Sequence, residues 1–108
     1  SAGLDSLRAG RGDAAVAALD RCPGPLAVRS RRPGDRLSLP GLAGHKKLQD
    51  LFVDRKVPRD QRDRVPLVVD RHDRIVWVPG QAVASEFRVT DSAQAVIILR
   101  LKVRGGSA

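Results

Sequence analysis

Short apolar segments separated by proline and glycine constrain the fold of this chain more than any other feature. Val and Ile make up 16 of the 30 Val, Leu, Ile and Phe residues. The apolar residues occur in brief runs, far shorter than the roughly 20 residues that a membrane-spanning helix needs. Seven prolines and ten glycines punctuate the chain. Val, Leu, Ile and Phe still make up 30 of the 108 residues, which is enough for a core. The pattern predicts a small α+β domain with a mostly antiparallel β-sheet or sandwich and one central helix.

The first part of the chain is expected to hold one short helix. Residues 1–12 are rich in Gly, Ser and Arg and are expected to be a loose lead-in. Asp13 can cap a helix that extends to Arg21, because the segment between them is rich in alanine. The sequence Pro23-Gly24-Pro25 stops that helix.

The central helix and the strands follow from hydrophobic spacing. An amphipathic helix is expected from His45 to Lys56, followed by a charged single turn over residues 59–64. The apolar face of this helix consists of Leu48, Leu51 and Phe52. The expected strands are 25–30, 66–70, 75–78, 87–90 and 95–103. The second and third of these strands are close enough to form a hairpin, and Trp77 between two valines is expected to be a core residue.

The basic residues are concentrated in one third of the sequence. The chain has a formal net charge of +8, and residues 29–64 carry eleven Lys or Arg against five Asp, a net +6. This distribution is typical of a basic patch, whereas a solubilising surface is the alternative. The three aromatic residues are too few for both a core and a base-stacking platform. We therefore expect a domain that binds the phosphate backbone of a nucleic acid.

The segment from Val28 to Arg36 is the most specific part of the basic region. Its arginines flank Pro33-Gly34, a sequence that favours a rigid turn. Guanidinium groups bind phosphate oxygens in a bidentate manner, so arginines held by such a turn suit an RNA backbone. The alternative is that one or more of them form internal ion pairs. Asp35 is expected to accept hydrogen bonds in the turn or to orient a neighbouring arginine.

Other motifs do not indicate catalysis or metal binding. Ser1–Ser6 resembles the loop of PP-loop enzymes, but no strand precedes it to present backbone amides to phosphate. His45 and His72 have no ligand-spaced partner, and no nucleophile-elbow sequence is present. Arg11-Gly12-Asp13 matches a cell-adhesion tripeptide by coincidence. We expect no catalytic, cofactor or metal site, no secretory signal and, with a single cysteine, a cytoplasmic protein.

Four further segments occur in one order with short gaps. They are V-R-S-R-R-P-G-D-R (Val28–Arg36), G-H-K-K-L-Q-D-L-F (Gly44–Phe52), V-P-R-D-Q-R-D-R-V-P-L-V-V-D (Val57–Asp70) and I-V-W-V-P-G (Ile75–Gly80). Together they resemble the C-terminal domain of tRNA(Ile)-lysidine synthetase, over about residues 25–103. One departure is the turn Arg71–Arg74, which stands where that family has a hairpin glycine.

The resemblance implies a parent enzyme that uses ATP with magnesium to convert the wobble cytidine of a minor isoleucine tRNA to lysidine. An N-terminal PP-loop domain carries that chemistry and is absent from this chain, so the chain alone is expected to be no enzyme. The C-terminal domain helps to hold tRNA(Ile) near its acceptor arm. The implied fold is a three-layer arrangement around a small β-sandwich, similar to a domain of the phenylalanyl-tRNA synthetase β chain.

These expectations assign a role to each part of the chain. Residues 1–24 are a lead-in with a short helix, 25–104 the tRNA-binding domain and 105–108 a flexible tail. The expected RNA-binding residues are Arg29, Arg31, Arg32, Arg36, Lys46, Lys47, Arg55, Lys56, Arg59 and Arg62. The expected partners are tRNA(Ile) and the parent's own catalytic domain, with no membrane, and a homo-oligomer is left open. The alternatives are an interaction domain that packs on its catalytic domain with its arginines turned inward, and a free-standing enzyme.

Overall fold

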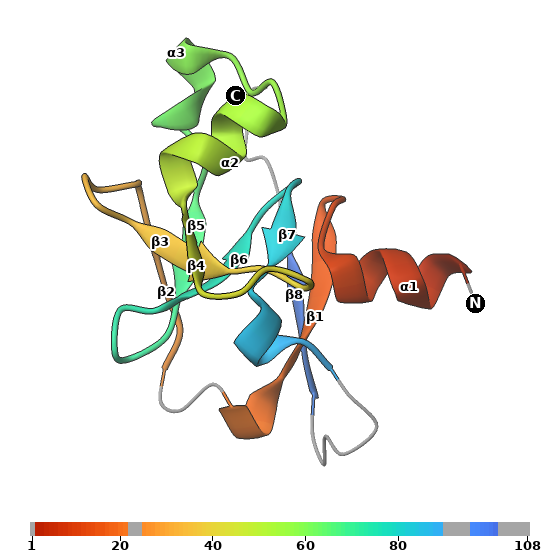
Figure 1. Ribbon diagram of the computed structural model, residues 1–108. Helices are drawn as coiled ribbons and strands as arrows, with labels where there is room; N and C mark the ends of the chain where they lie inside the picture. Colours follow the sequence, from red (N-terminus) through yellow and green to blue (C-terminus); the bar gives the residue numbers. More distant parts are fainter. Residues whose placement is uncertain (1, 22–24, 90–95, 102–108) are drawn as a thin grey trace, which may run out of the picture.

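Three antiparallel β-sheets and a few short helices make up the computed structural model, which describes residues 2–21, 25–89 and 96–101 (Figure 1). The helices are α1 (Ala2–Ala9), α2 (Leu48–Asp54) and α3 (Arg59–Arg62), with 3-10 turns η1 (Leu19–Arg21) and η2 (Ser85–Phe87). The strands are β1 (Ala14–Ala18), β2 (Ala27–Arg29), β3 (Arg36–Ser38), β4 (His45–Lys47), β5 (Leu67–Val69), β6 (Ile75–Val78), β7 (Ala82–Val83) and β8 (Val96–Arg100). Within the described ranges, every helix is too short or too polar to cross a bilayer. The α+β expectation is confirmed.

The largest sheet has four strands in the order β2-β5-β6-β7. β5 and β6 form the predicted hairpin, with Val68 opposite Trp77. Its turn works without glycine because Asp73 adopts φ +64, a left-handed conformation that Asp tolerates better than most residues. Asp70, which is buried, accepts hydrogen bonds from the backbone N–H groups of His72 and Arg74, at 2.9 Å each. The turn Arg71–Arg74 therefore supports the hairpin without a glycine.

The N-terminal region differs from its prediction in two places. Residues expected to be a loose lead-in include helix α1, which packs against β1 and β7. Residues expected to form a helix after Asp13 instead form strand β1, which pairs antiparallel with β8 over five positions. The physical reason is burial, because Ala15 and Ala17 are fully buried and their small side chains let β1 pack closely on the core. Helix propensity is weak enough for such tertiary contacts to override it.

The start of the predicted central helix is also wrong. His45–Lys47 is strand β4, paired with β3, and helix α2 begins at Leu48. Lys47 has extended backbone angles (φ −65, ψ 136) and precedes the first helical residue. The apolar face is as predicted, since Leu48, Leu51 and Phe52 are buried. The sequence pattern located the apolar face of the helix correctly. It could not show that Lys46 and Lys47 belong to β4, which pairs with β3.

Several other strand predictions have mixed outcomes. The strand near residues 25–30 exists as β2, but Val28 is 65% exposed and so does not face the core. Phe87 lies in turn η2 and is buried, so residues 87–89 are not the expected strand. The charged turn and the last strand are present as α3 and β8. Expectations for Pro23-Gly24, residues 90–95 and the tail at 105–108 lie outside the described residues.

The three aromatic side chains all belong to the core. Phe52, Trp77 and Phe87 are each at most 1% exposed, which confirms that Trp77 is a core residue. The Trp77 indole Nε1 donates a hydrogen bond to the carbonyl oxygen of Gly10, at 2.9 Å. Gly10 has φ +72, and a Cβ there would lie 2.6 Å from Val83 Cγ2, so the position requires glycine. The core thus anchors the end of α1 and leaves no aromatic side chain for base stacking.

Candidate nucleic-acid interface

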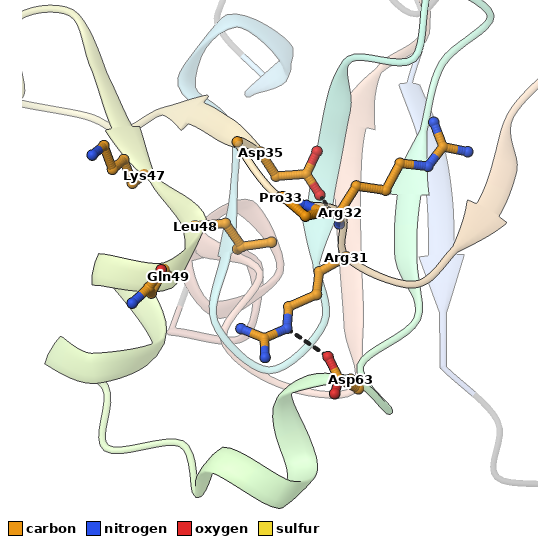
Figure 2. A pocket seen from close by; sticks show the side chains of 9 residues that line it. Arg31, Arg32, Pro33, Asp35, Lys47, Leu48, Gln49 and Asp63 are labelled. Atoms are coloured by element: carbon orange, nitrogen blue, oxygen red, sulfur yellow. Dashed lines mark hydrogen bonds and ion pairs between the residues drawn. The ribbon is translucent and has the colours of Figure 1, made fainter.

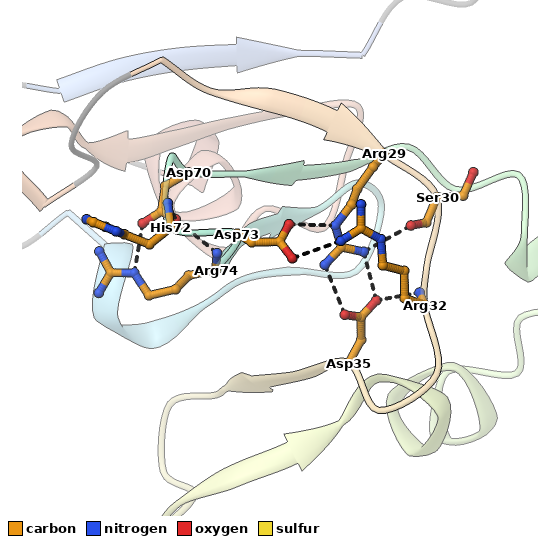
Figure 3. Close-up of polar contacts among 8 residues, drawn as sticks. All are labelled: Arg29, Ser30, Arg32, Asp35, Asp70, His72, Asp73 and Arg74. Carbon is orange, nitrogen blue, oxygen red and sulfur yellow. Dashed lines mark hydrogen bonds and ion pairs between the residues drawn. The ribbon is translucent and has the colours of Figure 1, made fainter.

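Arg29 is the centre of an internal network of ion pairs (Figure 3). Its guanidinium pairs with both carboxylate oxygens of Asp35, at 3.0 Å each, and its Nε donates to Asp73 at 2.8 Å. The Arg29 and Asp35 side chains are each only 12% exposed. These carboxylates raise the pKa of Arg29 well above its ordinary value despite the opposing effect of burial. Arg29 is among the residues predicted to contact RNA, and each of its three guanidinium nitrogens donates at least one hydrogen bond inside the protein.

The Pro33-Gly34 turn is held by the same network. Asp35 accepts a hydrogen bond from the backbone N–H of Arg32, at 2.7 Å, as expected of a carboxylate in this turn. Burial by itself raises the pKa of Asp35, but the hydrogen bonds from Arg29 and Arg32 outweigh it and lower the pKa below the ordinary value. The Arg32 side chain is 61% exposed and pairs with Asp73 at 3.0 Å. We call Arg29, Arg32, Asp35 and Asp73 the Arg29 network.

A cleft of about 340 Å³ lies beside this turn, between the turn and the start of α2 (Figure 2). Its lining includes Arg31, Lys47, Gln49 and Asp63. The Arg31 Nε donates to a carboxylate oxygen of Asp63 at 2.6 Å, so one exposed aspartate fixes the arginine at the cleft. The terminal nitrogens of Arg31 have no hydrogen-bond partner among the described residues. The cleft therefore presents cationic donors on two of its walls.

The β3–β4 ribbon places two cations directly opposite each other. Arg36 and Lys47 are register partners, and so are Ser38 and His45. Opposed residues of an antiparallel pair share a face, so Arg36, His45 and Lys47, all exposed, lie together on what we call the open ribbon face. Among the described residues, neither Arg36 nor Lys47 has an ion-pair partner. Like charges directly opposite each other on a β-ribbon are destabilising.

Lys46 differs from its neighbour Lys47 because it lies on the other face of the ribbon. Its register partner is the buried Leu37, and its ammonium group forms an ion pair with Asp54 of α2. Its side chain is 27% exposed, so it serves at least partly to join the ribbon to the helix. The two lysines were predicted as one pair at a helix start, and the strand separates them.

The remaining predicted cations follow α2 and lie on and around α3. Lys56 is exposed with φ +56, at the position after α2 where glycine is commonest, and its backbone N–H donates to Val53 O at 3.0 Å. Arg59 is exposed, and Arg55 is half-buried. Arg62 is half-buried and donates from Nε to Val57 O at 3.0 Å, so it closes the loop between the two helices. Of this group Lys56 and Arg59 are the more available to a ligand.

Sequence reasoning missed the acidic half of the site. Asp54 and Asp63 each pair with one of the predicted cations, and Asp73 pairs with two. Asp63 and Asp73 lie more than 30 residues from their partners in the sequence. The excess of arginine over aspartate in residues 29–64 hid these pairings, since net charge does not reveal contacts. The described residues contain no group of three or more His, Cys, Asp or Glu side chains that could hold a metal ion.

Residues 26–102 match the family model described as the TilS substrate C-terminal domain. A tRNA(Ile)-lysidine synthase of Symbiobacterium thermophilum is 53% identical over 85 residues, which are 79% of this chain and 17% of that protein. The tRNA(Ile)-lysidine synthase of Geobacillus kaustophilus is 49% identical over 75 residues, 69% of this chain and 16% of that protein. The chain thus spans about a sixth of the length of these curated relatives.

Two solved structures share the fold. The crystal structure of a TILS C-terminal domain is 38% identical with a TM-score of 0.70, covering 88% of this chain and 75% of that one. An N-terminal fragment of the phenylalanyl-tRNA synthetase β-subunit from Pyrococcus horikoshii has a TM-score of 0.67 at 17% identity, covering 82% of this chain and 28% of that one. The second likeness shows the fold alone, and it confirms the predicted similarity to that synthetase chain.

Proposed function

Because the chain belongs to the family of TilS substrate C-terminal domains, we propose that it holds tRNA(Ile) for a ligase that forms lysidine at the wobble cytidine. In this proposal, ATP and magnesium act at a catalytic domain of the parent enzyme. The residues of this chain bind and orient the RNA backbone near the acceptor arm and form no covalent bond. The names of the relatives support the reaction, and the basic surface supports the contact with RNA.

The observation that carries the proposal is the uncompensated charge on the open ribbon face. Arg36 and Lys47 repel each other across the ribbon at a cost of about 0.2–1 kcal/mol, the usual size of a cross-strand charge effect. A phosphate between them would turn that repulsion into two charge-assisted contacts. Retaining two facing cations therefore makes physical sense for a surface that receives a polyanion.

The cleft extends the same surface toward the Pro33-Gly34 turn. Lys47 lines it, and Arg31 reaches it with its terminal nitrogens available. Arg31 and Lys47 could then bind a further phosphate of the same strand, while the Arg29 network keeps the turn rigid. We place Lys56 and Arg59 in the proposed RNA-binding set as well. We assign Arg29, Lys46 and Arg62 a supporting role.

The salt dependence of tRNA binding tests this function. Fluorescence anisotropy with a tRNA(Ile) transcript carrying the CAU anticodon, at several KCl concentrations, gives the slope of log K against log salt. Lys47→Gln and Arg36→Gln should each weaken binding and flatten the slope by about one unit per lost phosphate contact. Arg21→Gln is the matched control, an exposed arginine at the end of η1 with the same change in charge. Salt-independent binding, or no binding, by the wild type would refute the proposal.

A second function is favoured by one separate observation. Val96 and Ile98 on β8 are 48% and 67% exposed, an unusual exposure for two large apolar side chains on one strand face. Packing of this strand on the parent's catalytic domain would cover them. Such a contact depends on apolar area, so it would be insensitive to salt and would survive Lys47→Gln.

A further inference from the structure

Three arginines gather at the end of α1, away from the set predicted to bind RNA. Arg8 lies in the last turn of α1, Arg11 follows it, and Arg88 follows η2. The Arg88 Nε donates to the backbone carbonyl of Arg8 at 3.2 Å, so two segments 80 residues apart meet here. Among the side chains described for residues 6–18, 20–21, 25–89 and 96–101, no carboxylate forms an ion pair with any of the three.

The charge at this place exceeds what the fold needs. A helix C-terminus carries roughly half a negative charge, which one guanidinium already balances. Arg88 fills that role through its bond to the Arg8 carbonyl. The Arg8 Nε is buried with no hydrogen-bond partner, and Arg11 is exposed. Burial lowers the pKa of Arg88, and the charge of Arg11 lowers it further.

The backbone on either side of Arg11 is held in place. Gly10, between Arg8 and Arg11, is fixed by the hydrogen bond from Trp77 and by its tight contact with Val83. The Gly12 carbonyl accepts a hydrogen bond from Gly80 N at 3.0 Å, which fixes the chain just beyond Arg11. Because the backbone beside Arg11 is already fixed, binding an anion there requires no ordering of the backbone.

We propose that Arg8, Arg11 and Arg88 form a second phosphate-binding site, which receives a backbone phosphate of the bound tRNA. Guanidinium groups without carboxylate partners suit phosphate oxygens. Two of the three arginines precede the segment matched by the family model. The site therefore extends the RNA footprint onto the N-terminal helix. This inference rests on the proposed function.

The test compares Arg11→Gln with Arg21→Gln in the whole 108-residue chain. Both substitutions remove one positive charge from an exposed arginine, but strand β1 separates the two positions. With the tRNA(Ile) transcript as probe, Arg11→Gln should weaken binding about threefold or more and flatten the salt slope by about one unit. Its melting temperature should hold, because Arg11 is exposed and forms no ion pair among the described side chains.

Equal affinity and slope for Arg11→Gln and Arg21→Gln would overturn the second site, while loss of binding in Lys47→Gln would leave the proposed function standing. Wild-type binding without salt dependence would instead defeat the proposed function itself. Inorganic phosphate is a second probe of the same site, and its effect on the melting temperature is measured. If it raises the melting temperature of the wild type but not of Arg11→Gln, while the two bind tRNA equally, the site takes free phosphate and the RNA proposal is overturned.

Discussion

The Arg29 network and the open ribbon face lie next to each other in the sequence and use their cations in opposite ways. In the network, Arg29 and Arg32 are paired with Asp35 and Asp73, and the inner ion pair is only 12% exposed on both sides. On the ribbon, Arg36 and Lys47 are exposed and face each other. The first arrangement fixes the backbone of the turn, and the second leaves charge that a ligand can use.

Arginines that lie close together in a sequence can therefore have different roles in the folded protein. The arginines of residues 28–36 look equivalent in the sequence, yet their carboxylate partners come from residues 35, 63 and 73. Position relative to these aspartates decides which side chains build the site and which can reach a phosphate. Variants of the two regions should accordingly separate stability from RNA binding.

Arg29→Met should have the largest effect, on stability. It leaves Asp35 nearly buried without its main partner, and breaking such a pair costs about 3 kcal/mol. Urea denaturation monitored by Trp77 fluorescence measures the loss. Arg36→Met is the matched control and should change stability by less than about 1 kcal/mol. Equal losses in the two variants would show that the division between network and ribbon is wrong.

Acidification should destabilise the Arg29 network, which depends on carboxylates, at a higher pH than it affects the open ribbon face. The pKa of Asp35 is lowered by its hydrogen bonds, although burial opposes this, and the pKa of Asp70 is lowered in the same way. A carboxylate with a lowered folded-state pKa adds stability above its unfolded pKa of about 4, and loses it as pH falls through the folded value. Asp35→Asn should cost about 2 kcal/mol at neutral pH.

Asp35→Asn should also lose less stability than the wild type as the pH falls below about 5. The reason is that this variant lacks the Asp35 carboxylate, whose protonation destabilises the folded state. Denaturation midpoints measured across that range give the comparison. A wild-type midpoint that does not fall as the solution is acidified would contradict the role assigned to these carboxylates.

Lys56→Gly should give a smaller effect, in the opposite direction. Lys56 holds a left-handed conformation that costs a non-glycine residue roughly 1 kcal/mol, so glycine there should raise stability by up to that amount. If Lys56 contacts RNA as proposed, the same variant should bind tRNA more weakly with a flatter salt slope. Lys56→Gln separates the two effects, since Gln lacks the charge but is as strained as Lys in this conformation. Unchanged tRNA affinity in both variants would remove Lys56 from the interface.

Local patterns predicted the parts of the fold that depend on neighbours in sequence. The β5–β6 hairpin, the Pro33-Gly34 turn and the apolar face of α2 all follow from residue spacing and turn chemistry. The errors fall where a distant partner decides. The strand β1 pairs with β8, more than 70 residues away, and this overrides the helix propensity of its alanines.

The candidate site shows the same division. Its basic character was visible in the sequence, and so was the possibility that some arginines are turned inward. The sequence did not show which arginines are turned inward, because Asp63 and Asp73 reach Arg31 and Arg29 only in the folded chain. The extended backbone of Lys47 likewise depends on pairing with β3, which a helical interpretation of residues 45–56 could not include.

The proposal that the open ribbon face binds RNA is tested most directly by Lys47→Glu, measured for both melting temperature and tRNA affinity. The substitution replaces a repulsion with an attraction to Arg36, so stability should hold or rise by a few tenths of a kcal/mol. Affinity for the tRNA(Ile) transcript should fall, with a flatter salt slope than the wild type. A variant that melts like the wild type and binds tRNA with unchanged affinity and slope would contradict this account.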